Sequence, residues 1–352
     1  MTILVTGAAG FIGSNFVIDW FGQSEEDLVS FDALTYAGNL ENLSSLNNRI
    51  NHYFIHGNIG DQLLVSEVLK KYQIRAVINF AAESHVDRSI HVPRDFIETN
   101  ILGTYNLLES VQSFWTGLNK DSKKAFRFLH ISTDEVYGSL CEKALASSEN
   151  SAYRPNNPYS ASKASSDHLV RAWFNTFGLP VLIGHCSNNF GPYQFPEKFI
   201  PLCILNAISL KSLPIYGDGK QIRDWTYVKD TCNAIRKILK KGSIGETYNI
   251  SSSNEKKNLE IAETLCAILD ELKPKFDGNS YSNQITHVKD RPGHDRRYAI
   301  NTSKLRGEMN WKPHETLETG LRKTVLWYLE NRTWLNNVVP DDYQHWMQEQ
   351  YS

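Results

Sequence analysis

The sequence predicts an α/β protein with a doubly wound parallel sheet and a smaller C-terminal α/β lobe. Short apolar runs at residues 2–6, 28–31, 76–81 and 126–132 alternate with helical stretches. Continuous apolar runs separated by helices are typical of parallel strands that are covered on both faces. A glycine-rich turn follows the first run and opens a helix at about residues 11–22, which is the order of elements that this fold requires.

The composition excludes several classes of protein. Of the 352 residues, 41% are hydrophobic and 22% are charged, which are ordinary globular values and exclude a disordered or collagen-like chain. The 37 basic and 39 acidic residues give a net charge of −2. This balance argues against a dedicated nucleic-acid binder, because affinity for phosphates needs a basic surface.

The cysteines are scattered and odd in number, so they predict neither a disulfide framework nor a bound metal. They are Cys141, Cys186, Cys203, Cys232 and Cys266. We expect free thiols in a reducing compartment. No apolar run approaches the roughly 18 residues that span a bilayer, and the apolar run at the start leaves no room for a signal peptide. A soluble cytoplasmic protein is therefore expected.

The change in composition along the chain predicts two domains. Residues 1–182 are expected to form the dinucleotide-binding domain, and residues 183–352 mainly a substrate-binding lobe. We expect the chain to return to the first domain near residues 225–250 and 300–320. Prolines and loops become frequent in the second part, which suggests a smaller lobe over the edge of the sheet.

Two long helices are expected, at about residues 94–116 and 158–177. The second ends at Gly178-Leu179-Pro180, a typical stop signal, and it is apolar on both sides. A helix of this kind needs two packing partners. One partner is the sheet, and the other is either a second subunit or the C-terminal lobe of the same chain. We favour a homodimer through these two helices.

The glycine-rich turn predicts a dinucleotide site. Gly7, Gly10 and Gly13 are spaced Gly-x-x-Gly-x-x-Gly, which allows a tight turn and a close approach to a pyrophosphate at a helix N-terminus. Asp32 closes the second strand, where a carboxylate binds both adenosine ribose hydroxyls and repels a 2′-phosphate. These residues favour NAD over NADP. The alternative is a structural turn with an aspartate cap.

Tyr159 and Lys163 are four residues apart and share one helix face. Tyrosine is a poor base at neutral pH, but a lysine ammonium and a positive nicotinamide ring would stabilise the phenolate and lower its pKa. We interpret the pair as catalytic; the alternative is a solvated helix face.

Asp134 and Glu135 follow a strand, at the edge where such sheets carry active sites. On a regular strand they would point to opposite faces, so both can serve one substrate only if the chain turns, as Gly138 permits. Their environments could then keep one protonated as an acid and the other ionised as a base. The alternative is an exposed acidic turn.

Taken together, these motifs resemble the extended short-chain dehydrogenase/reductase family and, within it, the dTDP-glucose 4,6-dehydratases. The resemblance covers nearly the whole chain and is carried by residues 32–40, 81–89, 132–138, 158–172, 186–193 and 290–298. Its most discriminating element is the Asp134-Glu135 pair, which epimerases of the same fold lack. The resemblance implies a dTDP-sugar substrate, a tightly bound NAD and the loss of water from the sugar.

The resemblance also implies roles for single residues. Tyr159, helped by Thr133, takes the proton of the sugar 4-hydroxyl. Glu135 removes the C5 proton and a protonated Asp134 donates to the departing 6-hydroxyl. The expected cofactor-binding residues are Gly7, Gly10, Phe11, Ile12, Gly13, Asp32, Ala33, Leu34, Thr35, Asn58, Ile59, Phe80, Ala81, Ala82, Thr99, Tyr159, Lys163 and Asn189. The expected substrate-binding residues are Ser84, Thr133, Asn188, Glu197, Lys198, Pro214, Tyr216, Arg223, Asn258, Arg291 and His294.

Three features depart from the family pattern. Ala33 replaces a frequent lysine, Asn58 replaces a frequent aspartate, and the segment 139–152 is short. We expect the first two to alter cofactor affinity rather than abolish binding. The competing hypotheses are another nucleotide-sugar dehydratase or epimerase of the same fold, and a non-catalytic NAD-binding regulator. The acidic pair argues against an epimerase, and the retained Tyr159 and Lys163 argue against a regulator.

Overall fold

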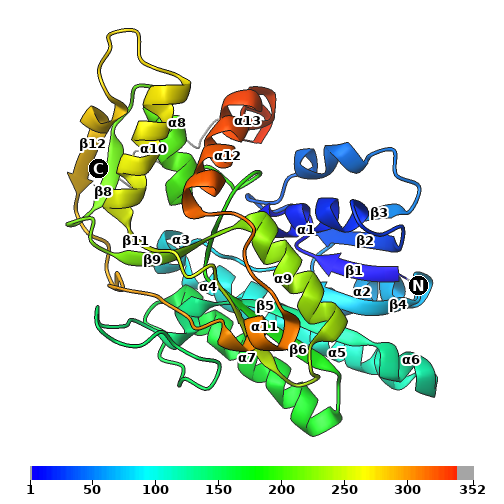
Figure 1. Cartoon of the computed structure of the whole chain (residues 1–352). Helices are drawn as coiled ribbons and strands as arrows, with labels where there is room; N and C mark the ends of the chain where they lie inside the picture. The colour runs from blue at the N-terminus through cyan, green and yellow to red at the C-terminus, as the bar shows by residue number, and fades with distance from the viewer. Residues whose placement is uncertain (1, 339–352) are drawn as a thin grey trace.

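The computed structural model describes residues 2–338, and its centre is a seven-stranded parallel sheet (Figure 1). The strand order is β10-β6-β5-β4-β1-β2-β3. The strands are β1 (Thr2–Thr6), β2 (Asp27–Asp32), β3 (His52–His56), β4 (Ile74–Asn79), β5 (Arg127–Thr133), β6 (Val181–Cys186) and β10 (Thr247–Ile250). The order runs outward in both directions from β1 and β4, so the predicted doubly wound α/β fold is confirmed.

Helices cover both faces of this sheet (Figure 1). One face carries α1 (Phe11–Phe21), α9 (Val228–Lys241) and α11 (Ser303–Met309), and the other α2 (Gln62–Lys71), α5 (Thr104–Thr116), α6 (Lys120–Ala125) and α7 (Pro158–Phe177). Successive strand residues point to opposite faces. Ile3 and Val5 therefore pack in the first core, and Leu4 packs in the second.

A second lobe lies beside the carboxyl ends of the strands. It contains a three-stranded sheet, β11-β9-β7, and a two-stranded sheet, β12-β8. Its elements are β7 (Asn188–Phe190), α8 (Phe199–Ile208), β8 (Leu213–Tyr216), β9 (Ile222–Tyr227), β11 (Glu255–Lys257), α10 (Asn258–Leu272), β12 (Ile285–Val288), α12 (Leu317–Glu330) and α13 (Arg332–Val338). An aromatic cluster of Tyr193, Trp327, Tyr328 and Trp334 forms one part of its core, in which Tyr328 and Trp334 are buried and the other two are partly buried.

The structure corrects the boundary expected at residue 182. That position lies inside β6, which pairs with β5 from Val181 to Cys186. The whole of β6 is buried, so the chain leaves the main sheet only after this strand. It returns with α9 and β10, and α11 packs against both. The expected return near 300–320 therefore corresponds to α11 and the buried Trp311 that follows it.

The helix expected at 94–116 has an irregular first half. It consists of α4 (Pro93–Phe96), a π-helical stretch at Ile97–Gly103, and α5. The π-helical stretch contains Asn100, which donates to Ser162 Oγ of α7 at 2.8 Å and accepts from the Glu83 amide at 2.9 Å. This side chain ties the helix to the loop after β4. Within residues 2–338, no helix combines the length and apolar character needed to cross a membrane.

Candidate active site

The glycine turn after β1 is shaped by close backbone packing. Gly7 has φ +66°, and a Cβ there would lie 2.6 Å from the Ala81 amide nitrogen. A Cβ on Gly13 would lie 2.1 Å from the Gly7 carbonyl oxygen. Gly10 begins α1 without any side-chain cap, so the first turn of the helix is open to a ligand phosphate.

Asp32 lies at the end of β2 with its carboxylate fixed by backbone amides. Oδ1 accepts from Leu34 N and Oδ2 accepts from Ala9 N, both at 2.8 Å. Burial raises the pKa of Asp32, and these two amide bonds oppose the rise. A carboxylate oxygen accepts more than one hydrogen bond, so both oxygens keep capacity for two ribose hydroxyls.

One elongated cavity runs from the glycine turn to Lys198. Its lining is Gly7, Gly10, Phe11, Ile12, Gly13, Phe31, Asp32, Ala33, Thr35, Ala37, Gly38, Gly57, Asn58, Ile59, Phe80, Ala81, Ala82, Glu83, Ser84, Thr99, Ile131, Ser132, Tyr159, Lys163, Gln194, Phe195, Glu197 and Lys198. Beside Asp32, the lining residues Ala33, Thr35 and Gly38 carry no positive charge. The donor set and the open helix end thus fit NAD, with its adenosine ribose at Asp32.

Two of the expected cofactor residues do not line this cavity. Leu34 packs against the apolar core, and only its amide serves the site, through Asp32. Asn189 donates to Ser187 O at 2.9 Å. Sequence reasoning missed the lining residues Phe31, Ala37, Gly38, Gly57, Glu83, Ile131, Ser132, Gln194 and Phe195. Of these, Gly38 could have been found as a glycine shortly after Asp32. The structure explains it, because a Cβ at this position would lie 2.7 Å from Asp32 Oδ1.

Asn58 shows how one departure from the family pattern is accommodated. Its Oδ1 accepts from the Gly60 amide at 2.8 Å. This bond closes the turn before α2, so the amide oxygen already has a structural partner. The remaining donor, Nδ2, is the group that Asn58 presents in place of a second carboxylate oxygen.

The acidic pair sits on a sharp turn at the end of β5. Thr133 ends the strand, and residues Asp134–Tyr137 form a 3₁₀ turn that closes at Gly138 with φ +78°. Thr133 Oγ1 accepts from Glu135 N and donates to Asp134 Oδ1, both at 3.3 Å. Because the chain turns here, Asp134 and Glu135 do not point to opposite faces of the sheet, as neighbouring residues on a strand would.

Asp134 and Glu135 have different surroundings. Asp134 is 3% exposed, and its Oδ2 is buried without a hydrogen-bond partner among residues 2–338. Burial, and then the nearby Glu135, raise the pKa of Asp134 well above its usual value, which favours the protonated acid. Glu135 is partly exposed, and its Oε2 accepts from Asn157 Nδ2 at 3.2 Å and Tyr298 OH at 3.4 Å.

Tyr159 and Lys163 are held at the start of α7. Asn157 caps this helix, with Ser160 completing the capping box. Lys163 is buried and its Nζ donates to Ile131 O at 2.8 Å. Burial lowers the pKa of Lys163 to about 8.

The expectation of a lowered pKa for Tyr159 includes a positive nicotinamide ring. Without that ring, the pKa of Tyr159 behaves differently. It is raised rather than lowered, mainly by burial and then by the charge of Glu135, and a hydrogen bond with Thr133 opposes the rise. The protein alone therefore keeps Tyr159 protonated.

Apart from Thr133, which ends β5, the expected substrate residues fall into two groups. Ser84, Glu197 and Lys198 line the cofactor cavity, where Lys198 Nζ donates to Ser84 O at 2.7 Å. Glu197 is held by Arg88 Nε at 3.0 Å and by Tyr36 OH at 2.8 Å. Burial lowers the pKa of Lys198. This corner of the cavity therefore concentrates charged side chains.

The second group lies in the smaller lobe. Two of its residues donate to the Asp87 carboxylate: Arg291 Nη1 to Oδ1 at 2.9 Å and Tyr216 OH to Oδ2 at 3.3 Å. Arg223 donates to Asp295 O at 2.9 Å and stacks over the Tyr298 ring at 4.5 Å. Asn188 and Asn258 keep buried Oδ1 atoms, and Arg291 a buried Nε, without a partner among residues 2–338. Pro214 is buried in β8.

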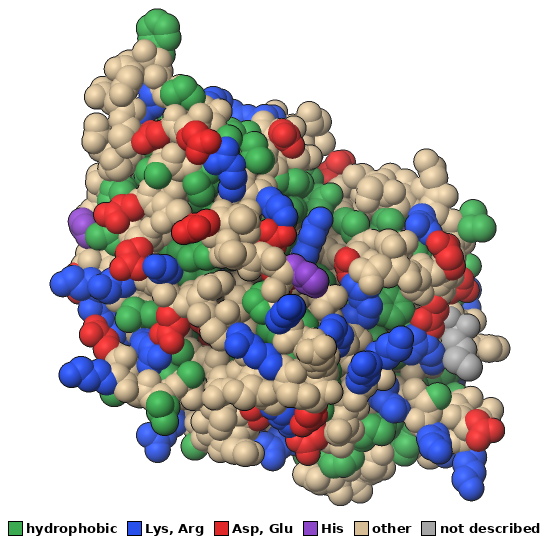
Figure 2. Space-filling view, viewed as in Figure 1, with side chains coloured by type: hydrophobic (Ala, Val, Ile, Leu, Met, Phe, Trp, Pro, Cys, Tyr) green, Lys and Arg blue, Asp and Glu red, His purple; other side chains and the backbone are tan. Residues whose placement is uncertain are grey.

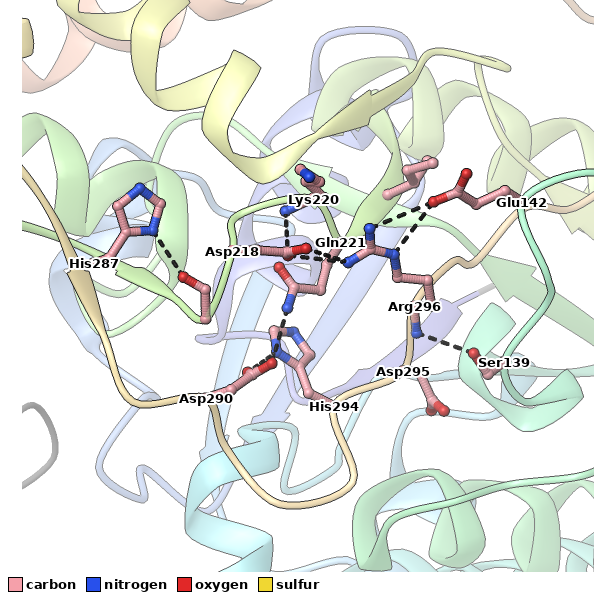
Figure 3. A network of polar contacts seen from close by, with 12 residues as sticks. Ser139, Glu142, Asp218, Lys220, Gln221, His287, Asp290, His294, Asp295 and Arg296 are labelled. Atoms are coloured by element: carbon pink, nitrogen blue, oxygen red, sulfur yellow. Dashed lines mark hydrogen bonds and ion pairs between the residues drawn. The ribbon is translucent and has the colours of Figure 1, made fainter.

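A polar network joins this lobe to the loop after the acidic turn (Figure 3). Arg296 pairs with Asp218 at 3.0 Å and Glu142 at 3.4 Å. Nearby, His294 Nδ1 bonds to Asp290 Oδ1 at 2.6 Å, and burial, with Arg291, lowers the pKa of His294 to about 4. The short 139–152 segment is thus anchored to the chain around Arg296.

Comparison with known proteins identifies the family of the chain. The family model for GDP-mannose 4,6 dehydratase matches residues 4–324. A dTDP-glucose 4,6-dehydratase of Xanthomonas campestris pv. campestris is 54% identical over 343 residues, with 97% of each chain covered.

Two solved dTDP-glucose 4,6-dehydratases have the same fold. The enzyme from Bacillus anthracis, in complex with NAD, has a TM-score of 0.84 at 44% identity, covering 96% of this chain and 99% of its own. The enzyme from Streptomyces venezuelae, with NAD bound, has a TM-score of 0.87 at 40% identity, covering 96% and 100%. The chain therefore belongs to the extended short-chain dehydrogenase/reductase family, in the branch formed by the dTDP-glucose 4,6-dehydratases.

Proposed function

We propose that this chain is an NAD-dependent hydro-lyase that converts dTDP-glucose to dTDP-4-keto-6-deoxyglucose and water. The observation that carries the proposal is the turn at Asp134 and Glu135. It holds a buried, protonated carboxyl and a more exposed carboxylate beside one hydroxyl, that of Thr133. An acid and a base at one site are what the elimination of water requires.

We propose that NAD occupies the elongated cavity with its pyrophosphate at the N-terminus of α1 and its adenosine ribose at Asp32. When bound, NAD accepts a hydride from C4 of the sugar and later returns it to C6, and its positive ring favours the Tyr159 phenolate. Glu197 and Lys198 line the same cavity as the cofactor residues, so the sugar would bind next to a cofactor that stays in place throughout a turnover.

The residues divide the proton chemistry. Tyr159 takes the proton of the 4-hydroxyl, with Thr133 hydrogen-bonded to the same phenol. Glu135 takes the C5 proton once the 4-ketone has made it acidic, and Asp134 gives its proton to the departing 6-hydroxyl. Lys163 keeps a positive charge next to this chemistry. Positioned acids and bases of this kind each contribute roughly 10²- to 10⁴-fold in rate.

We propose that the smaller lobe binds the dTDP group. Lys198, Arg223 and Arg291 supply cations for the diphosphate. The unpaired amide oxygens of Asn188 and Asn258 supply acceptors, because a buried polar atom without a partner is costly unless a ligand satisfies it.

We further propose a cytoplasmic homodimer formed through α5, α7 and the π-helical stretch between α4 and α5. Four large apolar side chains are exposed there, namely Ile97, Leu102, Tyr105 and Phe177. Tyr105 also packs edge-on against Trp173 of α7, with ring centres 5.8 Å apart. An apolar face on two adjacent helices is typical of a two-fold interface. The free cysteines support a reducing compartment.

The decisive experiment is a product assay with purified protein, dTDP-glucose and no added cofactor. We expect a product lighter by one water, in large excess over enzyme, and a Tyr159→Phe variant that forms almost none. A product of unchanged mass would indicate an epimerase. If NAD addition also gives no product, UDP- and GDP-sugars are tested next, and turnover of one of these would replace dTDP-glucose as the substrate.

A further inference from the structure

The proposed reaction leaves two residues in the wrong protonation state after each turnover. Tyr159 begins as phenolate and gains the 4-hydroxyl proton. Asp134 begins protonated and loses its proton to the departing hydroxyl. Glu135 takes a proton from C5 and returns one to C5, so it ends unchanged. One proton must therefore move from Tyr159 to Asp134 before the next substrate can react. This inference rests on the proposed function.

Bulk water has poor access to the residue that needs the proton. Asp134 is 3% exposed. Its Oδ2 has no hydrogen-bond partner among the described residues, and its Oδ1 is bonded to Thr133. A buried carboxylate is costly to leave charged, and this environment strongly favours the protonated form. The structure therefore drives reprotonation of Asp134 but offers solvent little direct path to it.

One hydroxyl contacts both residues. Thr133 Oγ1 donates to Asp134 Oδ1 at 3.3 Å. The same hydroxyl lies beside the Tyr159 phenol, where a hydrogen bond from Thr133 acts to lower the pKa of Tyr159. A hydroxyl has one donor and two acceptor positions. The Glu135 amide uses one acceptor position at 3.3 Å, which leaves the other for Tyr159 and the donor for Asp134. The 3₁₀ turn and the start of α7 hold all three groups on rigid elements.

We propose that Thr133 is the proton relay that resets the site, carrying the proton from Tyr159 to Asp134. The Tyr159 O–H bond breaks as its proton binds Thr133 Oγ1, and the original Thr133 proton passes to Asp134 Oδ1. Tyr159 becomes phenolate and Asp134 becomes neutral. No electrons are transferred, and no other reactant is needed. Before the reaction, the same hydroxyl rotates to donate to the phenolate.

The test uses NAD-loaded enzyme and rapid quenching of the reaction with saturating dTDP-glucose. Thr133→Val removes the hydroxyl at nearly constant volume, and Thr133→Ser keeps it. We expect the unmodified and serine enzymes to form product without a burst. The valine enzyme is expected to form about one product per site and then continue on the order of 10²-fold more slowly. Its slow phase should slow further in D₂O, because a proton must then come from solvent.

Three outcomes would overturn the relay. The first is a valine enzyme without a burst, whose single-turnover and steady-state rates fall by the same factor. The second is a burst of equal size in the serine enzyme. The third is a slow phase insensitive to D₂O, which would assign it to product release. If the valine enzyme does not fold, Thr133→Ala carries the same expectations. An unmodified protein that removes no water from dTDP-glucose would instead contradict the proposed function.

Discussion

Lys163 and Asp167 lie one turn apart on α7, and both are buried beneath the active site. Lys163 Nζ is fixed by Ile131 O at 2.8 Å. Asp167 Oδ2 accepts from Ser132 Oγ at 2.9 Å and Tyr153 OH at 3.2 Å, and it lies 3.0 Å from His185 Nε2. Burial acts to raise the pKa of Asp167, but His185 and its neighbours hold it below the usual value. Without a direct ion pair between them, the negative charge of Asp167 still acts on Lys163 and opposes the lowering of its pKa by burial.

Replacing Asp167 by asparagine is expected to move the pH dependence of turnover. Loss of the negative charge lowers the pKa of Lys163 further below about 8. Since activity needs the ammonium form, the alkaline limb of the kcat profile should shift to lower pH. Removing one partner of a buried charge pair also costs about 3–5 kcal/mol of stability. A kcat–pH profile and a thermal melt check both, with Asp121→Asn at an exposed site as control. An unchanged alkaline limb would contradict this role.

Replacing Glu135 by glutamine separates oxidation from elimination. The glutamine keeps its place beside Asn157 and Tyr298 but cannot accept the C5 proton. We expect the absorbance of reduced nicotinamide to appear slowly after dTDP-glucose is added, while no water is lost. Stopped-flow absorbance and product mass measure the two steps. Dehydration at the normal rate would show that Glu135 is not the base.

Asp32 is expected to set the choice between NAD and NADP. Asp32→Ser removes the carboxylate that the ribose hydroxyls would bind and that would repel a 2′-phosphate. We expect NAD affinity to fall on the order of 10- to 100-fold, since each hydrogen bond to a charged group contributes roughly 1.5–3 kcal/mol. Affinity for NADP should change far less. Calorimetric titration of both cofactors tests this, with Glu41→Ser as an exposed control, and equal losses for both would contradict it.

The apolar face around Phe177 predicts the effect of a charge on assembly. Phe177 is 50% exposed on α7 and Leu102 is 51% exposed on the neighbouring π-helical stretch. Phe177→Glu or Leu102→Glu should convert a dimer to monomer in sedimentation equilibrium, because an unpaired charge is costly in a buried interface. Phe276→Glu, in an exposed loop of the other lobe, is the matched control. A dimer that persists in both variants would rule out this face.

Buried histidines predict a loss of stability in mild acid. Burial lowers the pKa of His130 to about 3, whereas the unfolded chain titrates near 6.5. Between these values the unfolded state binds a proton that the native state does not, so stability falls as pH falls, by at most about 1.4 kcal/mol per pH unit. Thermal melts at pH 6.5 and 5 should show this fall, and His130→Gln should reduce it. The exposed His91→Gln is the control, and identical falls in all three proteins would refute the assignment.

The parts of the site that follow from local sequence were predictable. The turn at Gly7 and the acidic residue at Asp32 are separated by one helix and one strand, so their spacing carries the information. Strand β3 was missed because it reads His-Tyr-Phe-Ile-His and lacks the apolar run of a central strand. It needs none, since it lies at the sheet edge and is half-buried.

Contacts between distant segments were not predictable from one sequence. The ion pair of Arg291 with Asp87 is one such contact, since it joins residues 204 positions apart. The effects of burial and of Glu135 on the Tyr159 pKa were also not predictable, because pattern and spacing do not reveal them. The fold class follows from periodicity, whereas charge balance requires the packed structure.

The place of β10 in the sheet has a consequence for biosynthesis. It pairs with β6 and ends at Ile250, after much of the smaller lobe has been translated. On the ribosome, β6 therefore emerges as an unprotected edge and stays so until β10 follows. An exposed hydrophobic edge strand has unpaired backbone groups that can form hydrogen bonds with other nascent chains. Slow translation between Cys186 and Ile250 should therefore increase aggregation, and chaperone protection should matter most in that interval.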